Sequence, residues 1–263
     1  MGAIFVRDRK LATSYETSVA MQWTQVVVGV VVTYMISSMV APSTRFGFDG
    51  HVDKYFNYVM VNVAFITFQV TALQSFSKVV RDGQMQGTLE VVLSTPTALS
   101  LIVVSGCLWA FTWTSLQAAV ELSVATMWFG LDLSHTNLVS GAVFLLLTVL
   151  SLSPLGIAAA AFTMIFKQVG PVDFLMNNLG FMFGGIYLPI ASLPLWCQAI
   201  GWTLPITHAL NGLRGATHGA SLAQLAPDAI WLTAASIILF PASLYAFNRA
   251  VRHAKIVGTL ASY

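Results

Sequence analysis

Charge is the property that this sequence has least of. Only 8% of its 263 residues are Asp, Glu, Lys or Arg, whereas 57% are hydrophobic, and soluble domains carry about 25% charged residues. The mean hydropathy is +0.77. This composition excludes a water-soluble enzyme and a disordered chain, and a net charge of +2 is too small for a nucleic-acid binder. We therefore expect an all-α polytopic membrane protein with no nucleic-acid partner.

Residues and motifs typical of catalytic, metal or nucleotide-binding sites are equally scarce. The two cysteines, Cys107 and Cys197, lie far apart in apolar sequence, which argues against a disulfide framework and against zinc spacing. The sequence contains no H-E-x-x-H, no G-x-S-x-G and no G-K dipeptide of a P-loop. We expect no catalytic residues, no metal site and no ATPase site in this chain. The missing motifs oppose the alternative of an intramembrane enzyme.

Long uncharged stretches separate the few charges. A helix that spans a membrane needs about 20 mostly apolar residues, and six stretches meet this length. Before the first of them, Leu11, Tyr15 and Val19 recur at helical spacing, which predicts an interfacial helix over 1–21, with a polar tail as the alternative. The expected spans are 22–40, 55–77, 99–129, 138–166, 174–190 and 229–248.

The distribution of the basic residues predicts the orientation. With both termini in the cytoplasm, nine of the twelve basic residues fall on the inner side, as the positive-inside rule requires. Only Arg45, Lys54 and Arg214 would lie outside. We therefore expect a multi-pass membrane protein with cytoplasmic termini.

Glu121 is the one acid inside an expected span. An ionisable residue in a membrane helix is costly and often functional, so Glu121 is a candidate for the transport pathway. Its alternative role is structural pairing with a polar neighbour near the outer interface. An ion-coupled carrier would need several such groups, which makes a carrier or channel the weaker alternative.

The segment 82–96, between the second and third expected spans, has the pattern of a short helix. Gly87 and Thr88 suit a helix start, Glu90 suits the positive end of the helix dipole, and Pro96 ends it. The helix would present three apolar side chains on one face, those of Leu89, Val92 and Leu93. An ordinary capped loop is the alternative.

The uncharged stretch after the fifth expected span is too rich in proline for one helix. Pro189, Pro194 and Pro205 interrupt any regular helix, and broken backbone at membrane depth occurs only inside protein or along a cavity. We expect a pair of re-entrant helices on the outer side, over 191–227.

These two segments resemble those of type-2 ATP-binding-cassette (ABC) exporter permeases, the group that includes drug exporters and polysaccharide-export permeases. Residues Gly87 to Pro96 resemble the family's G-T-L-E-x-L-L-x-T-P string and depart only at Val92. The resemblance implies a coupling helix that docks into a separate ATPase subunit. The implied ATPase-coupling residues are Gly87, Thr88, Leu89, Glu90, Val92, Leu93, Ser94, Thr95 and Pro96.

The proline-rich segment is similar to the family's Y-x-P-[IV]-x-x-L-P and L-P-x-T-[HY] motifs, which are followed by a late arginine. The resemblance implies an outer gate formed by Tyr187, Pro189, Pro194, Trp196, Pro205, His208 and Arg214.

From this resemblance we expect a permease subunit of an ABC exporter, moving a drug-like or lipid-linked amphipathic substrate outward by alternating access. Its partners would be ATPase subunits, which bind ATP and Mg, and a second permease copy in a homodimer, or a paralogue in a heterodimer. The alternative substrate is a lipid-linked polysaccharide.

Overall fold

The computed structural model describes residues 16–40, 51–85, 99–166 and 171–257, and every regular element in this part of the chain is a helix. This agrees with the all-α class expected from the composition. The elements are α2 (Glu16–Val40), α3 (Val52–Met85), α5 (Leu99–Phe129), α6 (Leu138–Phe166), α7 (Pro171–Phe183), the 3-10 turn η2 (Ile190–Ser192), α8 (Leu195–Thr203), α9 (Pro205–Thr217) and α10 (Ala226–Val257).

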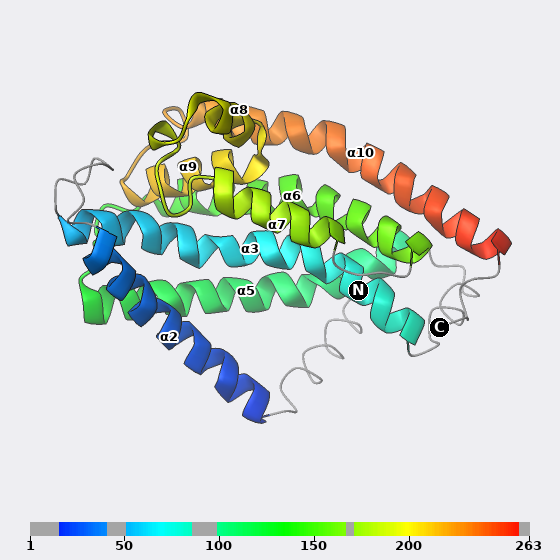
Figure 1. Cartoon of the computed structure of the whole chain (residues 1–263), viewed down its shortest axis with the longest axis horizontal. Helices are drawn as coiled ribbons and strands as arrows, with labels where there is room; N and C mark the ends of the chain where they lie inside the picture. The colour runs from blue at the N-terminus through cyan, green and yellow to red at the C-terminus, as the bar shows by residue number, and fades with distance from the viewer. Residues whose placement is uncertain (1–15, 41–50, 86–98, 167–170, 258–263) are drawn as a thin grey trace.

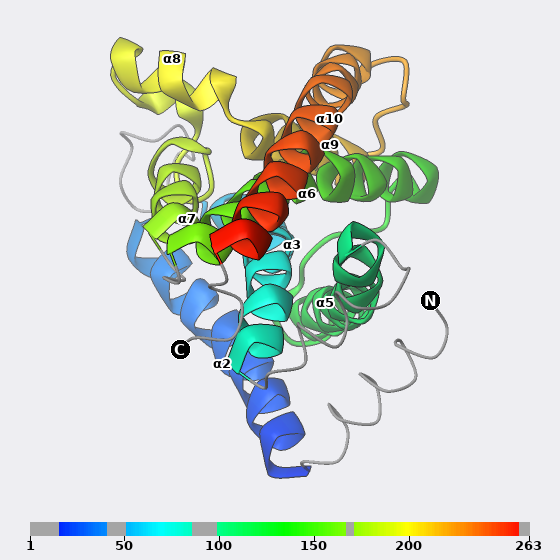
Figure 2. The ribbon, with the colours of Figure 1, turned by 90° about the vertical axis from the view of Figure 1, so that its right-hand side faces the viewer.

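Helix α3 is the centre of an elongated bundle (Figure 1). Seen along the bundle, the other long helices surround it (Figure 2), and α6 packs along both α3 and α10. In the most apolar stretch of each helix, 67% of the α3 residues are buried, against 17% in α2 and in α10. The outer faces of α2 and α10 are therefore available to lipid or to a partner chain.

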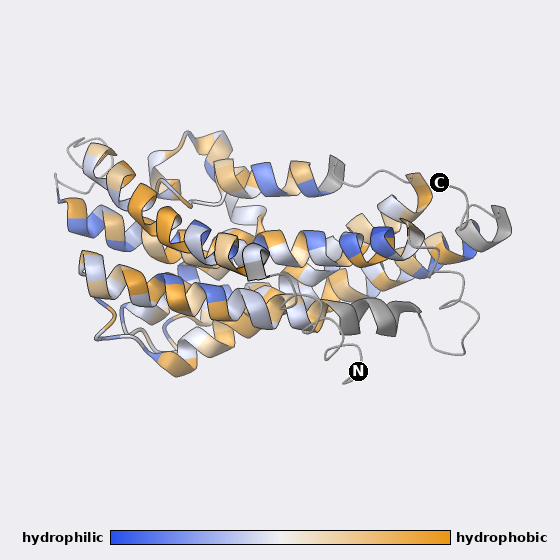
Figure 3. Ribbon diagram, turned by 90° about the horizontal axis from the view of Figure 1, so that it is seen from below, coloured by the Kyte–Doolittle hydropathy of each residue, from blue (hydrophilic) through white to orange (hydrophobic). Residues whose placement is uncertain are grey.

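The bundle has two distinct ends (Figure 1). At one end α3, α6 and α10 finish and α5 and α7 begin; we call it the coupling end, because the segment 86–98 connects α3 to α5 there. The opposite end carries α8, α9 and the connection 130–137, and we call it the cap end. Hydrophobic residues cover much of the long helices, with hydrophilic ones interspersed (Figure 3).

Two glycines let the helices of the core approach closely. A Cβ atom on Gly156 of α6 would lie 2.0 Å from the carbonyl oxygen of Ala72 in α3. A Cβ atom on Gly212 of α9 would lie 1.9 Å from the ring of Phe144 in α6, which is fully buried. Glycine thus sets the close packing of α3, α6 and α9, since small residues allow membrane helices to come together.

Among the residues that the structure describes, four helices are long and apolar enough to cross a membrane: Val19–Val40, Val52–Gly83, Leu138–Phe166 and Ala226–His253. Helix α5 covers 99–129, the residues expected for the third span, and runs beside α3. The fifth expected span, 174–190, differs: α7 has 13 residues and ends at Phe183. At 1.5 Å per residue it is about 20 Å long, less than the roughly 30 Å of a bilayer core.

Other boundaries also differ from expectation. Helix α2 begins at Glu16, so residues 16–21 belong to the same helix as 22–40, and α10 extends beyond 229–248 at both ends. The start of the predicted segment 82–96 continues α3 as far as Met85. The predicted ATPase-coupling residues, Gly87 to Pro96, lie outside the described residues, as does most of the segment 1–21.

Candidate functional site

Polar side chains of α3 hold the backbone turn that follows α7 at the cap end. Buried Asn62 donates from Nδ2 to the carbonyl oxygen of Ile186 at 2.7 Å and to that of Gly185 at 3.3 Å. The hydroxyl of Tyr58 also donates to the Gly185 oxygen, at 2.5 Å. These bonds satisfy carbonyl groups that the end of α7 leaves without helical partners, which a low-dielectric interior requires.

The turn itself depends on glycine. Gly185 has φ +74°, a left-handed conformation that side chains with a Cβ atom disfavour. It ends α7 after Phe183 and directs the chain toward η2, for which Pro189 is the N-cap residue. The hydroxyl of Tyr55 donates to the backbone carbonyl oxygen of Tyr187 at 3.0 Å. The cap-end turn, residues 184–188, is thus fixed to the first turns of α3.

The contact between α3 and α7 stays polar toward the middle of the bundle. Gln69 of α3 donates to the carbonyl oxygen of Met176 at 3.2 Å and more weakly to Asn177 Oδ1 at 3.5 Å. A Cβ atom on Gly180 would lie 2.3 Å from the Gln69 amide nitrogen, so the glycine makes room for this side chain. Gly180 therefore allows α7 to pack closely against α3 of the same chain.

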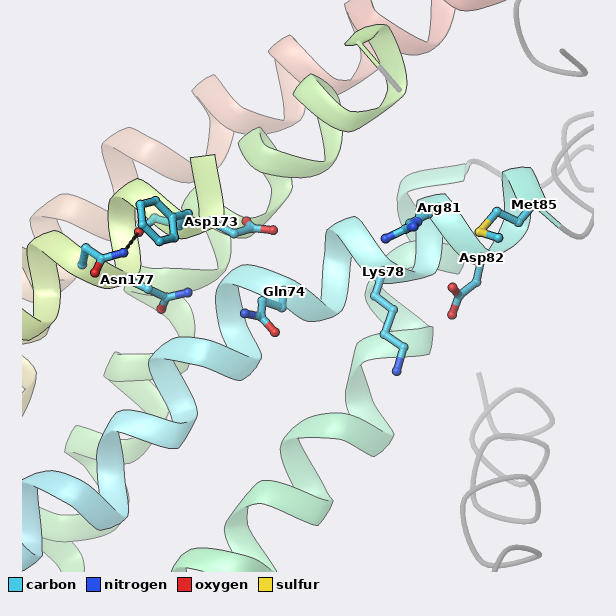
Figure 4. A pocket seen from close by; sticks show the side chains of 9 residues that line it. Gln74, Lys78, Arg81, Asp82, Met85, Asp173 and Asn177 are labelled. Atoms are coloured by element: carbon cyan, nitrogen blue, oxygen red, sulfur yellow. Dashed lines mark hydrogen bonds between the residues drawn. The ribbon is translucent and has the colours of Figure 1, made fainter. Parts of the chain in front are cut away.

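At the coupling end, α3 and α7 separate and leave a pocket of about 480 Å³ (Figure 4). This volume is typical of a small-molecule site, for which about 300–1,000 Å³ is usual. Polar and charged side chains predominate in the lining, and Asp173 and Arg81 project toward the space between the two helices from opposite sides. The lining consists of Gln74, Lys78, Arg81, Asp82, Met85, Asp173, Phe174, Asn177 and Asn178.

Asp173 is the most enclosed charged group of this coupling-end pocket. It is 4% exposed, its Oδ1 atom has no hydrogen-bond partner among the described residues, and the hydroxyl of Ser77 on α3 lies beside the carboxylate. Within the same part of the chain, no ion pair joins it to Lys78 or Arg81. A buried oxygen of this kind is costly unless a donor or cation meets it.

Arg214, one of the predicted outer-gate residues, lies where α9 meets α3. Its guanidinium group is 4.5 Å from the centre of the Tyr58 ring, its Nε donates to the Leu210 oxygen at 3.2 Å, and a further bond goes to Asn211. The positive charge of Arg214 is therefore stabilised by the face of the Tyr58 ring and by hydrogen-bond acceptors on its own helix.

His208, another predicted outer-gate residue, joins α8, α9 and α10. Its Nδ1 lies 2.6 Å from Asp228 Oδ1 and its Nε2 lies 3.0 Å from the Trp202 oxygen. Both partners are acceptors, so both bonds form only when both ring nitrogens carry protons. Burial lowers the pKa of His208, but the bonds to Asp228 and Trp202 outweigh it and raise the pKa above 6.5. The ring also stacks on Trp231 at 4.4 Å.

The remaining predicted outer-gate residues occupy the same end of the bundle without forming one cluster. Tyr187 is partly exposed and accepts the bond from Tyr55. Pro194 is the N-cap residue of α8. Pro205 is the first residue of α9 and is buried. Trp196 is exposed and touches Phe183 edge-on, with 6.0 Å between ring centres. The prolines thus set helix boundaries.

Glu121, the predicted pathway residue, is buried on α5. One of its carboxylate oxygens faces α2, where a Cβ atom on Gly29 would lie 3.8 Å away. It lies neither at the coupling-end pocket nor near the polar contact between α3 and α7. The structure therefore separates Glu121 from the other candidate residues.

Sequence patterns did not predict several residues of this arrangement, among them Asn62, Gln69 and Asp173. A signal was present: Tyr55, Tyr58, Asn62 and Gln69 recur at intervals of three, four and seven residues, which places them on one face of a helix. Polar residues aligned in this way within an apolar span mark a face turned toward protein or a cavity.

Comparison with known families identifies the class of protein. The model of the ABC-2 type transporter family matches residues 3–217, most of the chain. No curated protein matches the chain significantly.

The chain therefore belongs to the ABC-2 type transporter family and is a membrane protein. Its matching domain is the permease component of such a transporter, and not the ATPase. In the described part of the chain, no three His, Cys, Asp or Glu residues are grouped as metal ligands.

Proposed function

We propose that the chain is the membrane-spanning subunit of an ATP-driven exporter with six spans and two cytoplasmic termini in a prokaryotic plasma membrane. It would act with a second permease copy, or a paralogue, and with ATPase subunits that bind ATP and Mg. The substrate would be an amphipathic compound, drug-like or lipid-linked, that leaves the cell by alternating access.

The observation that carries this proposal is the continuity of α3. This helix runs over 34 residues, Val52–Met85, which corresponds to about 51 Å at 1.5 Å per residue. Its last turn precedes the predicted coupling helix, and its first turns hold the cap-end turn through Asn62, Tyr58 and Tyr55. In the proposed mechanism, a displacement of one end would therefore move the other.

Closure of the ATPase dimer would push on the segment 87–95, and α3 would move as a rigid body. Rigid-body and shear motions of packed helices are a common form of switching. Because α3 holds residues 184–188, its motion would also move the chain that leads into η2 and α8. In this scheme the predicted outer gate opens when the coupling helices move, and Arg214 stabilises its closed form through Tyr58.

The test replaces the apolar face of the coupling helix. Burying each leucine in a partner's cleft is worth about 1.5–3 kcal/mol, so a Leu89→Asp, Leu93→Asp double variant should insert in the membrane but no longer copurify with the ATPase. Substrate-stimulated ATP hydrolysis should be lost as well. Paired cysteines at Leu89 and in the ATPase cleft should crosslink in the unaltered background.

Val91→Asp is the matched control, since position 91 lies on the other face of the predicted helix. It should retain copurification and ATP hydrolysis. If the double variant assembles with the ATPase and exports at the normal rate, the coupling role and the proposed function are both refuted.

A further inference from the structure

The coupling-end pocket carries charges of opposite sign that do not neutralise each other. Lys78, Arg81 and Asp82 come from α3, which leaves one net positive charge on that side, whereas Asp173 comes from the first turn of α7. No ion pair within 4.0 Å connects the two sides in the described part of the chain. A ligand that carries both charges would satisfy both sides at once.

We propose that this pocket binds the zwitterionic head group of an amphipathic substrate, with its cationic group at Asp173 and its anionic group at Arg81. The inference deepens the proposed function and rests on it, because it names the substrate class of the same permease.

The buried carboxylate favours a cationic group on the α7 side. Oδ1 of Asp173 is enclosed and has no hydrogen-bond partner among the described residues; the Ser77 hydroxyl of α3 is the neutral donor beside this carboxylate, and no cation meets it although the side chain borders the pocket. A carboxylate in this position is stabilised most by a cation or a strong donor. The neighbouring Asn177 adds an amide group to the lining on the same side.

The α3 side favours an anionic group. Arg81 points toward the space between the helices, whereas the Lys78 side chain, three residues earlier on α3, points away from it (Figure 4). Arginine offers a planar set of donors suited to phosphate or carboxylate. Basic residues at a membrane interface often serve only to position a helix, but that role does not account for a buried Asp173 opposite them.

The rim of the pocket suits the apolar part of such a substrate. Phe174 is 71% exposed and Met85 is 61% exposed, and both line the pocket. A long alkyl chain would lie against them while the head group lies between Asp173 and Arg81. The combination fits an amphipathic zwitterion better than a small inorganic ion.

Three probes with the same short tail separate the possibilities: hexylphosphocholine, hexyl phosphate and hexyltrimethylammonium. Calorimetric titration of the full chain in lipid nanodiscs measures their binding without the ATPase. We expect hexylphosphocholine to bind roughly tenfold tighter than either singly charged probe, since each lost charge pair weakens binding on that order. Equal binding of hexyl phosphate would overturn the proposal in favour of an anion site, and equal binding of all three would reduce it to nonspecific partitioning.

Two variants locate the site. Asp173→Asn should weaken hexylphosphocholine roughly tenfold and leave hexyl phosphate unchanged, whereas Arg81→Gln should weaken both but spare hexyltrimethylammonium. Lys54→Gln is the control, because it removes one cation from the opposite end of the same helix. If Asp173→Asn and Arg81→Gln behave like this control, the pocket is not the binding site.

This experiment is independent of the coupling test. Binding with the expected preference in a chain whose coupling variant still exports would preserve the pocket and refute the ATP-coupled mechanism. Loss of the binding preference in a chain whose coupling variant fails to export would refute the pocket alone.

Discussion

The guanidinium group of Arg214 lies 4.5 Å from the centre of the Tyr58 ring, and the hydroxyl of the same ring donates to the Gly185 oxygen. A single aromatic side chain of α3 thus contacts α9 through its face and the cap-end turn through its hydroxyl. Because cation–π contacts are worth about 0.5–2 kcal/mol, Arg214 contributes to holding α9 against α3.

Arg214→Ala should slow export in reconstituted vesicles while the chain still copurifies with the ATPase, because the loss is confined to the cap end. Arg214→Lys keeps the charge but loses the planar contact, so it should fall between the alanine variant and the wild type. Arg249→Ala, which removes an exposed arginine of α10, is the control. Normal export by Arg214→Ala would show that the gate does not depend on this contact.

Asn62→Leu should uncouple the cap-end turn from α3. The leucine keeps a similar volume but leaves the carbonyls of Gly185 and Ile186 without this donor, at a cost of about 1–3 kcal/mol. We expect a lower melting temperature in detergent and loss of substrate-stimulated ATP hydrolysis. Thr67→Val is the control on the same helix, because the Thr67 hydroxyl bonds within the described part of the chain to the Ala64 oxygen of its own helix. Equal effects of both variants would contradict the role of Asn62.

The pair of His208 and Asp228 should make the stability of the cap end depend on pH. The folded-state pKa of His208 is raised above 6.5, so its contribution is fully present below about pH 6.5, the unfolded value, and is lost as pH rises through the folded value. Asp228→Asn should remove about 1–2 kcal/mol at low pH and less at high pH. Melting curves of both proteins between about pH 5.5 and 8.5 measure this difference. A constant difference would contradict the charged pair.

Gly212→Ala should destabilise the contact between α6 and α9. Its Cβ atom would lie 1.9 Å from the ring of Phe144, and overpacking of this kind costs about 1–3 kcal/mol. Gly141→Ala, in the same interface, places its Cβ atom 4.0 Å from that of Ala216, an ordinary contact. Thermal unfolding in detergent should therefore separate the two variants, and equal melting temperatures would refute the close approach.

The sequence predicts the long helices well where charges bound them. Helix α6 covers 138–166, the stretch that ends before Lys167, and α5 covers 99–129, the stretch that ends before Asp132. Such boundaries follow from the cost of placing charge in a bilayer. Helix α7 is shorter than expected because the conformation of Gly185 ends it, which hydropathy alone does not reveal.

The polar contact between α3 and α7 is harder to predict. The partners of Asn62 and Tyr58 are backbone carbonyl oxygens, and every residue has a carbonyl, so the sequence does not indicate which one will be used. The coupling-end pocket presents the same difficulty, because Asp173 and Arg81 come to line one pocket only through the packing of two helices.

The bond from Asn62 to Ile186 spans 124 residues of the chain. A ribosome adds about 5–20 residues per second, so roughly 6–25 seconds separate the synthesis of the two partners. During this interval α3 enters the membrane with its amide and phenol groups lacking their final acceptors at residues 185–187. The order of synthesis therefore requires that water, lipid head groups or the insertion machinery accommodate these groups until α7 arrives, and they acquire their native acceptors only when the last third of the protein is being made.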